Sequence, residues 1–188
     1  FASKAHRTKA TLPYFIPAPS IIGTFGAFIK MKSPIFTRKA LIDIGATGPL
    51  IGFTLSLIAC IIGLKMSKIV PITAEKDAFM LGDSILFSLL VKFTIEKIPE
   101  GYDVLLHSVA FAGWIGLFVT SMNLLPVGQL DGGHVAYALF GNWHFYISRA
   151  IVFFIAALGV FYWYGWLVWV LLLVFLGIDH PPILIWES

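Results

Sequence analysis

The sequence contains few charged residues and a single cysteine. Only 12% of its 188 residues are Asp, Glu, Lys or Arg, against roughly 25% in an average soluble domain. The mean hydropathy is +0.90. This composition excludes an ordinary soluble domain and indicates an integral membrane protein with a single domain over residues 1–188. The lone Cys60 excludes an internal disulfide and a cysteine-based metal site, so we interpret it as a packing residue.

The usual motif of a zinc hydrolase is also missing. The chain has five histidines, but it contains no His-Glu-x-x-His and no two histidines four residues apart. A catalytic zinc site needs about three protein ligands and an open position for water. The sequence therefore does not provide a complete zinc site of this kind.

Acidic residues are absent from the beginning of the chain, where basic residues gather. Seven of the 13 basic residues precede Asp43, the first acid: Lys4, Arg7, Lys9, Lys30, Lys32, Arg38 and Lys39. Such a flank is typical of the cytoplasmic side of a membrane, where it contacts anionic head groups. We expect no nucleic-acid binding, because no soluble module presents these charges.

Prolines and glycines set the expected structure of the first 32 residues. Pro13, Pro17 and Pro19 prevent a continuous helix and favour an extended path. Residues 22–32 alternate apolar and polar side chains after two glycines, which predicts a short strand or hairpin near the N-terminus. Backbone of this kind at membrane depth must be covered by protein or line a wet cavity.

Long apolar runs predict the remaining architecture. The expected membrane spans cover residues 44–64, 104–125, 147–163 and 166–178, joined by a polar connection over 65–76 and a short interfacial helix over 83–98. The last two spans are separated by an aromatic turn at Trp163–Trp166. The predicted fold is an all-α polytopic membrane protein, a multi-helix transmembrane bundle with a short β-strand or hairpin segment near the N-terminus.

The most informative stretch is Asn123–His134, which reads Asn-Leu-Leu-Pro-Val-Gly-Gln-Leu-Asp-Gly-Gly-His. It places Asp131 beside two glycines after a strongly apolar run, and an ionised carboxylate at membrane depth costs at least ~2.5 kcal/mol. Three interpretations are open for Asp131: a metal ligand, a proton-relay or ion-coupling acid, and an N-cap of the following helix.

Two neighbouring polar residues leave similar choices. The amide of Asn123 suits a substrate backbone or an oxyanion, but it also suits an interhelical hydrogen bond. His134 lies three residues after Asp131 and so shares its helical face, as a second metal ligand or as a polar packing partner. Pro126 leaves nearby backbone groups without helical hydrogen bonds, and Gly132 and Gly133 have no side chains beside the acid. Together these residues predict an irregular, accessible pocket wall.

The pattern Asn123-x-x-Pro126-x-x-x-Leu130-Asp131-Gly132 resembles the second signature of the site-2 proteases, the M50 zinc metalloproteases that cleave inside membranes. The similarity is to bacterial and plastid members without an obvious PDZ domain. Further segments resemble this family in the expected order, so the resemblance covers nearly the whole chain. These segments are residues 12–17, 23–27, 45–50, 107–114 and 180–182.

The resemblance implies a role for each matching residue. Asp131 would be the third zinc ligand, and Asn123 would contact the substrate backbone near the cleaved bond. A substrate-binding strand formed by Gly23, Thr24, Phe25, Gly26 and Ala27 would hold the substrate extended. The site would be shaped by Pro126, Leu130, Gly132, Gly133, Gly48 and Pro49. Pairing an unwound substrate with a strand edge restores backbone hydrogen bonds lost in lipid.

The chain departs from the family pattern in one respect. The family's helix bearing His-Glu-x-x-His, which supplies two zinc ligands and the general base, has no counterpart here. Because Phe1–Lys4 resembles the residues that follow that motif, we expect an N-terminally truncated chain rather than an inactive paralogue. The chain alone would be inactive.

The resemblance implies a zinc-dependent intramembrane endoprotease with one Zn²⁺ per full-length protein. Its expected partners are the lipid bilayer and transmembrane segments of membrane-bound regulatory or signal-anchor proteins. A bacterial cell membrane is the preferred location, with a plastid membrane as the alternative. The rival functions are an inactive membrane scaffold or chaperone that binds transmembrane helices, and an ion-coupled transporter that uses Asp131.

Overall fold

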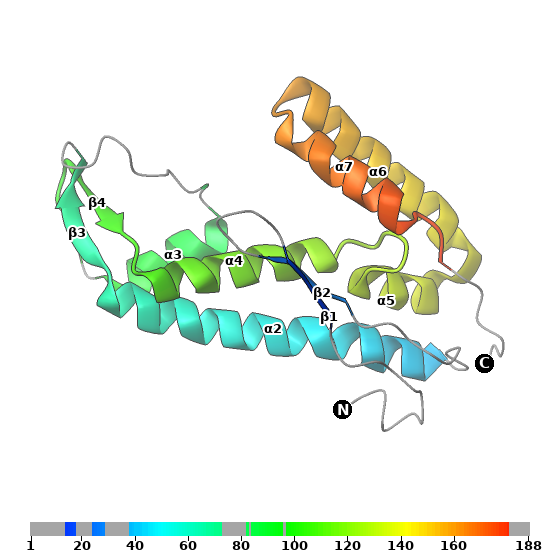
Figure 1. Ribbon diagram of the computed structural model, residues 1–188, viewed down its shortest axis with the longest axis horizontal. Helices are drawn as coiled ribbons and strands as arrows, with labels where there is room; N and C mark the ends of the chain where they lie inside the picture. The colour runs from blue at the N-terminus through cyan, green and yellow to red at the C-terminus, as the bar shows by residue number, and fades with distance from the viewer. Residues whose placement is uncertain are drawn as a thin grey trace. The chain divides into compact units, whose positions relative to one another are not determined.

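The computed structural model describes residues 14–17, 24–28, 38–72, 82, 84–95 and 97–180 (Figure 1). Internal contacts divide the chain into two compact units. The first comprises residues 1–48 and 124–188, and the second comprises residues 49–123. Helix α2 contributes its N-terminal part to the first unit and the rest to the second.

The first unit begins with a pair of short strands. Strand β1 (Tyr14–Pro17) pairs antiparallel with β2 (Thr24–Phe28), with an irregularity in the register between Phe15 and Pro17. The predicted strand or hairpin near the N-terminus is thereby confirmed. Gly23, which the sequence assigned to the substrate-binding strand, lies outside the described residues.

Helix α2 (Arg38–Met66) begins six residues before the expected start of the first span, at residue 44. The extension contains Lys39 and Asp43, which the sequence analysis placed outside the apolar run. Pro49 lies inside the helix and has no N–H to donate to the carbonyl of Gly45. The flanking backbone bonds of a long helix compensate for this single missing bond.

The second unit contains a strand pair that the sequence analysis did not predict. Strands β3 (Lys68–Pro71) and β4 (Tyr102–Leu105) pair antiparallel, with Lys68 opposite Leu105 and Pro71 opposite Tyr102. Residues 68–71 were expected to be a polar connection, and 104–105 the start of a helix. Four-residue strands are too short to show a period of two, which explains the misassignment.

Two helices complete the second unit. Helix α3 (Ile85–Thr94) starts after Ser84, whose hydroxyl accepts a hydrogen bond from the Phe87 N–H at 3.1 Å, and ends four residues before the expected boundary at 98. Helix α4 (Ser108–Asn123) ends shortly before Pro126. The residue before a proline, here Leu125, disfavours helical backbone. Buried Cys60, Leu64, Phe87 and Ala110 form the core, so Cys60 packs as interpreted.

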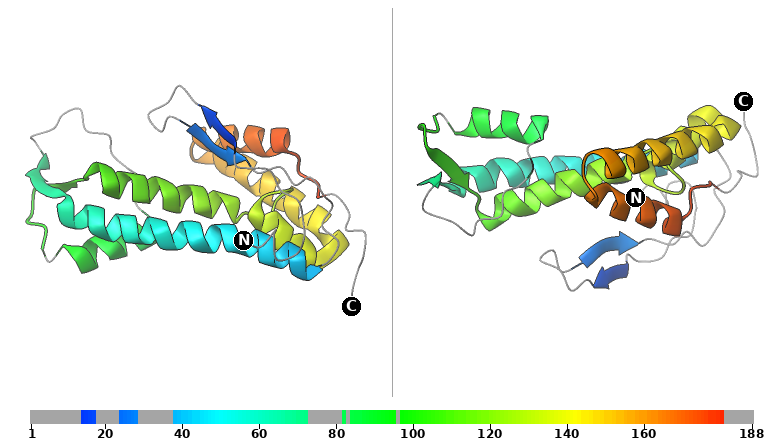
Figure 2. Two further views of the ribbon diagram at one scale, coloured as in Figure 1. Left: turned by 60° about the horizontal axis from the view of Figure 1, so that its bottom comes forward. Right: turned by 90° about the horizontal axis from the view of Figure 1, so that it is seen from above.

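The remaining helices of the first unit follow one another closely. They are α5 (Asp131–Phe140), the 3₁₀ turn η2 (Gly141–Trp143), α6 (His144–Phe161) and α7 (Gly165–Leu176). Helices α6 and α7 lie side by side in each view (Figures 1 and 2). Val127, Val152, Ile155 and Leu173 form their shared core. The break between α6 and α7 falls at residues 162–164, within the aromatic sequence.

Within the described part of the chain, two helical segments are long and apolar enough to cross a membrane, Arg38–Met66 and Asp131–Phe161. Large apolar side chains on α6 and α7 remain exposed, including Phe153, Phe161 and Phe175 at 77%, 81% and 87%. An apolar surface of this extent is unfavourable in water and favourable in lipid. The protein is mostly helical and is embedded in the membrane.

Candidate functional site

Asp131 is the first residue of α5, and its side chain is half-buried. Leu130 occupies the N-cap position in an extended conformation, and no side chain provides a cap hydrogen bond. The interpretation of Asp131 as the helix N-cap is therefore wrong. The carboxylate nevertheless lies in the first turn, where the helix dipole favours a negative charge.

Two glycines of α2 lie against Asp131. A Cβ atom built on Gly48 would lie 3.3 Å from the Asp131 carboxylate Oδ2, and one built on Gly45 would lie 2.8 Å from the Asp131 carbonyl oxygen. Gly48 is itself exposed, and its lack of a side chain lets α2 approach the carboxylate. The structure thus brings together Asp131 and Gly48, both predicted as site residues.

The loop before α5 fits closely against the helix that it introduces. A Cβ on Gly132 would collide with the carbonyl oxygen of Leu124, and a Cβ on Gly133 would collide with that of Gly128. Both glycines are buried. Gly128 has a φ of +53°, in the left-handed region that glycine adopts without strain. The two glycines after Asp131 therefore allow the loop to fold back on α5.

Helix α6 anchors the same loop through one buried hydroxyl. Ser148 is fully buried, and its Oγ lies 3.3 Å from the carbonyl oxygen of Pro126 and 3.4 Å from the backbone nitrogen of Gly128. The hydroxyl can donate to Pro126 and accept from Gly128. It also lies 3.2 Å from Nε2 of His144, which is itself buried. This network satisfies loop backbone groups that water does not reach.

A second set of contacts joins α5 to the segment that follows α7. Nδ1 of His134 lies 2.7 Å from Nε2 of His180, in the segment that follows α7. The His180 ring stacks on Tyr137 with a centroid separation of 4.4 Å and an interplanar angle of 13°. This contact agrees with the interpretation of His134 as a polar packing partner. Ser148 and His180 were missed as site residues because their partners lie 22 and 46 residues away in sequence.

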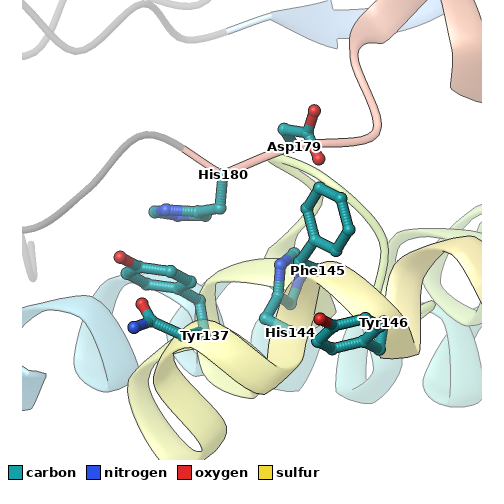
Figure 3. Close-up of a pocket in the computed structure, with 7 residues that line it drawn as sticks. Tyr137, His144, Phe145, Tyr146, Asp179 and His180 are labelled. Carbon is teal, nitrogen blue, oxygen red and sulfur yellow. The ribbon is translucent and has the colours of Figure 1, made fainter.

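A pocket of about 440 Å³ opens beside this contact, at the C-terminal end of α5 (Figure 3). Figure 3 shows the His180 ring lying flat over Tyr137, with Asp179 and Phe145 to one side and with His144 and Tyr146 below Phe145 in this view. Hydrogen bonds from Arg149 hold the pKa of Asp179 below its usual value. None of the residues that line the pocket was predicted as a site residue, and the pocket does not reach Asp131.

The donor chemistry at Asp131 fits one ligand of a zinc site. The carboxylate is a hard oxygen donor of the kind zinc accepts, and Gly48 presents no side chain beside it. Over the described residues, no group of three or more His, Cys, Asp or Glu is arranged to hold a metal ion.

The other predicted site residues fall in several places. Pro126 and Leu130 belong to the anchored loop of the first unit, whereas Pro49 and Asn123 belong to the second unit. Asn123 is half-buried and is the last residue of α4. The predicted substrate-binding residues Thr24–Ala27 lie on β2, of which one edge is paired with β1.

Comparison with known proteins gives a consistent result. Residues 4–165 match the sequence profile described as Peptidase family M50. The probable zinc metalloprotease EGY3, chloroplastic, of Oryza sativa subsp. indica is 57% identical over 148 residues, which cover 69% of this chain and 24% of that protein. The resemblance inferred from the signature around Asp131 is confirmed.

Two further relatives carry similar names. The probable zinc metalloprotease EGY1, chloroplastic, of Oryza sativa subsp. japonica is 36% identical over 141 residues, 72% of this chain and 24% of that protein. The corresponding EGY2 of Arabidopsis thaliana is 33% identical over 135 residues, 71% and 24%. The chain spans about a quarter of the length of these curated relatives. No solved structure matches the chain.

Proposed function

Because the chain belongs to peptidase family M50, we propose that it forms part of a zinc-dependent intramembrane endoprotease. The observation that carries this proposal is the placement of Asp131, whose carboxylate lies against the exposed backbone of Gly48. Three relatives named probable zinc metalloproteases support the metal and the reaction class. The proposal applies to the whole protein, in which two further ligands and a general base must accompany Asp131.

In this proposal Asp131 is one ligand of a single zinc ion. Bound zinc would supply a Lewis acid for the scissile carbonyl and lower the pKa of a bound water to about 7. Four glycines around Asp131 determine how its side chain is placed. Gly45 and Gly48 remove side chains from the α2 surface under Asp131, and Gly132 and Gly133 let the preceding loop pack against α5.

We assign substrate binding to the unpaired edge of β2 and to Asn123. Among the residues that the structure describes, β2 pairs with β1 alone, which leaves its other edge open in that part of the chain. An extended peptide that adds to such an edge regains the backbone hydrogen bonds that lipid cannot provide. Asn123 would then donate to the substrate backbone near the cleaved bond. The expected substrates are transmembrane segments of regulatory or signal-anchor proteins.

We also propose that the helices form a polytopic transmembrane bundle in a plastid membrane. Helices α2 and α5–α6 would span the membrane, and the shorter apolar helices α3, α4 and α7 would pack with them or lie at its surface. The names of all three relatives described above include the word chloroplastic. This favours a plastid membrane over the bacterial cell membrane that the sequence analysis preferred.

Cleavage of a reporter transmembrane segment by the full-length protein in detergent tests this function. We expect Asp131→Asn to abolish cleavage, because an amide is a poor zinc ligand compared with a carboxylate. Asp103→Asn is a matched control, since the Asp103 carboxylate lies on β4 and accepts a hydrogen bond from its neighbour Val104. Cleavage by Asp131→Asn at the wild-type rate would refute the assignment of the ligand.

A further inference from the structure

The segment after α7, residues 177–180, contacts the chain on both sides of Asp131. Three residues before Asp131, Gly128 approaches Gly177 so closely that a Cβ on Gly128 would collide with the Gly177 carbonyl oxygen. Three residues after Asp131, the ring of His134 meets the ring of His180. One short segment therefore touches both the loop that leads into α5 and the first turn of α5.

His180 is held in a defined orientation by two different contacts. Its Nε2 lies 2.7 Å from Nδ1 of His134, so one imidazole donates its N–H to the unprotonated nitrogen of the other. The face of the ring stacks on Tyr137 at 4.4 Å. The stack fixes the plane of the ring (Figure 3), and the hydrogen bond fixes its direction within that plane.

The segment is also tied to α6, independently of α5. Arg149 donates to both carboxylate oxygens of Asp179, at 2.7 and 3.3 Å, and its guanidinium lies 3.4 Å from the centroid of the Phe145 ring. Helices α6 and α7 pack through the same apolar core, so residues 177–180 are attached to this helix pair as well as to α5. Through this attachment, residues 177–180 can restrain the movement of α5.

We propose that His180 is a positioning residue for the Asp131 carboxylate and acts through its hydrogen bond to His134. Residues three apart in a helix differ by about 60° in direction and by ~4.5 Å along the axis. A restraint on the His134 side chain therefore opposes rotation of α5, and rotation of α5 would turn the Asp131 carboxylate away from Gly48. The proposal rests on the function proposed above, in which Asp131 is a zinc ligand.

The experiment measures the rate at which a chelator removes zinc from the full-length protein in detergent, together with the thermal unfolding temperature. His180→Phe keeps a ring on Tyr137 but loses the hydrogen bond, whereas His180→Gln keeps a polar group at the position of Nε2. We expect His180→Phe to release zinc roughly three- to tenfold faster, which corresponds to the loss of one net hydrogen bond. His180→Gln should remain within about twofold of the wild type by the same measure.

Two further variants make the test specific. His134→Phe removes the same hydrogen bond from the other side, and the double variant with His180→Phe should release zinc no faster than either single variant. His107→Phe is the control, because it removes the 3.3 Å contact of His107 Nδ1 with the Val109 N–H at the start of α4. This control should lower the unfolding temperature and leave zinc release unchanged.

The outcomes separate the two proposals. If Asp131→Asn loses zinc while His180→Phe and His134→Phe release it at the wild-type rate, His180 has no positioning role and only this inference fails. Equal acceleration by His180→Gln and His180→Phe, in step with the unfolding temperature, would likewise reduce His180 to a structural residue. A folded parent protein that holds no zinc would overturn the proposed function and this inference together.

Discussion

The contact between Gly48 and Asp131 gives a sharp prediction about substitution in α2. A Cβ at position 48 would lie 3.3 Å from the Asp131 Oδ2. This is close, but a shift of a few tenths of an ångström accommodates it. Valine adds two methyl groups about 1.5 Å further out, and its χ1 is nearly fixed in a helix. In Gly48→Val the carboxylate must therefore move.

The expected magnitude follows from the strain of overpacking. Inserting bulk at a packed contact costs about 1–3 kcal/mol. If the carboxylate relieves that strain by moving, zinc affinity in the full-length protein should fall roughly 5- to 150-fold. Gly48→Ala should change the affinity by less than about threefold, because the single Cβ fits with a small shift. Competition with a chelator of known zinc affinity measures both variants.

Gly52 provides a matched control one turn further along the same helix. A Cβ there would lie 3.2 Å from the Thr120 Oγ1, nearly the same separation from a polar oxygen. Gly52→Val carries the same β-branched penalty for helix propensity and a similar steric conflict, but its neighbour is a threonine of α4. It should lower stability without changing zinc affinity. Equal zinc affinity in Gly48→Val and Gly52→Val would refute the placement of Asp131.

Three further predictions concern other parts of the chain. Asn123→Ala should slow cleavage roughly 100-fold or more with zinc still bound, if its amide contacts the reacting carbonyl; loss of metal would instead mean structural support. The pKa of Asp179 is lowered by hydrogen bonds from Arg149, so the pair stabilises the folded state above the usual Asp value of 3.8 and is lost as pH falls through the lower folded value. Asp179→Asn should therefore lower the unfolding temperature by the same amount at pH 7 and at pH 5. If the variant were less stable than the wild type at pH 7 but equally stable at pH 5, the pKa of Asp179 would not be lowered. In Gly113→Ala the new Cβ would lie 2.6 Å from the backbone nitrogen of Cys60, so we expect a loss of about 1–3 kcal/mol of stability in a thermal unfolding assay, with zinc affinity unchanged.

Some features were recognisable from the sequence because they depend on neighbouring residues. Asp131 stood out because an acid followed by two glycines interrupts a long apolar run. Pro126 marked the end of the preceding helix, since the residue before a proline disfavours helical backbone. The glycines and prolines near the N-terminus likewise indicated extended chain, and β1 and β2 pair there.

Other features depend on contacts between distant residues, which no local pattern reveals. The strands β3 and β4 are four residues each, and they pair across more than 30 positions of sequence. Ser148 contacts a loop 20 residues earlier, and His180 contacts a residue 46 positions earlier. An isolated serine within an apolar helix and a histidine in a loop carry no such information, because their partners are determined only by the folded chain.

The role of Asp131 as a zinc ligand is tested by the zinc content of the full-length protein, purified in detergent beside Asp131→Ala. We expect about one zinc per parent molecule and substantially less in the variant, with both proteins folded as judged by circular dichroism. A folded parent protein without zinc, or a variant that retains the full zinc content, would show that Asp131 is not a zinc ligand. The first of these results would favour a scaffold that binds transmembrane helices.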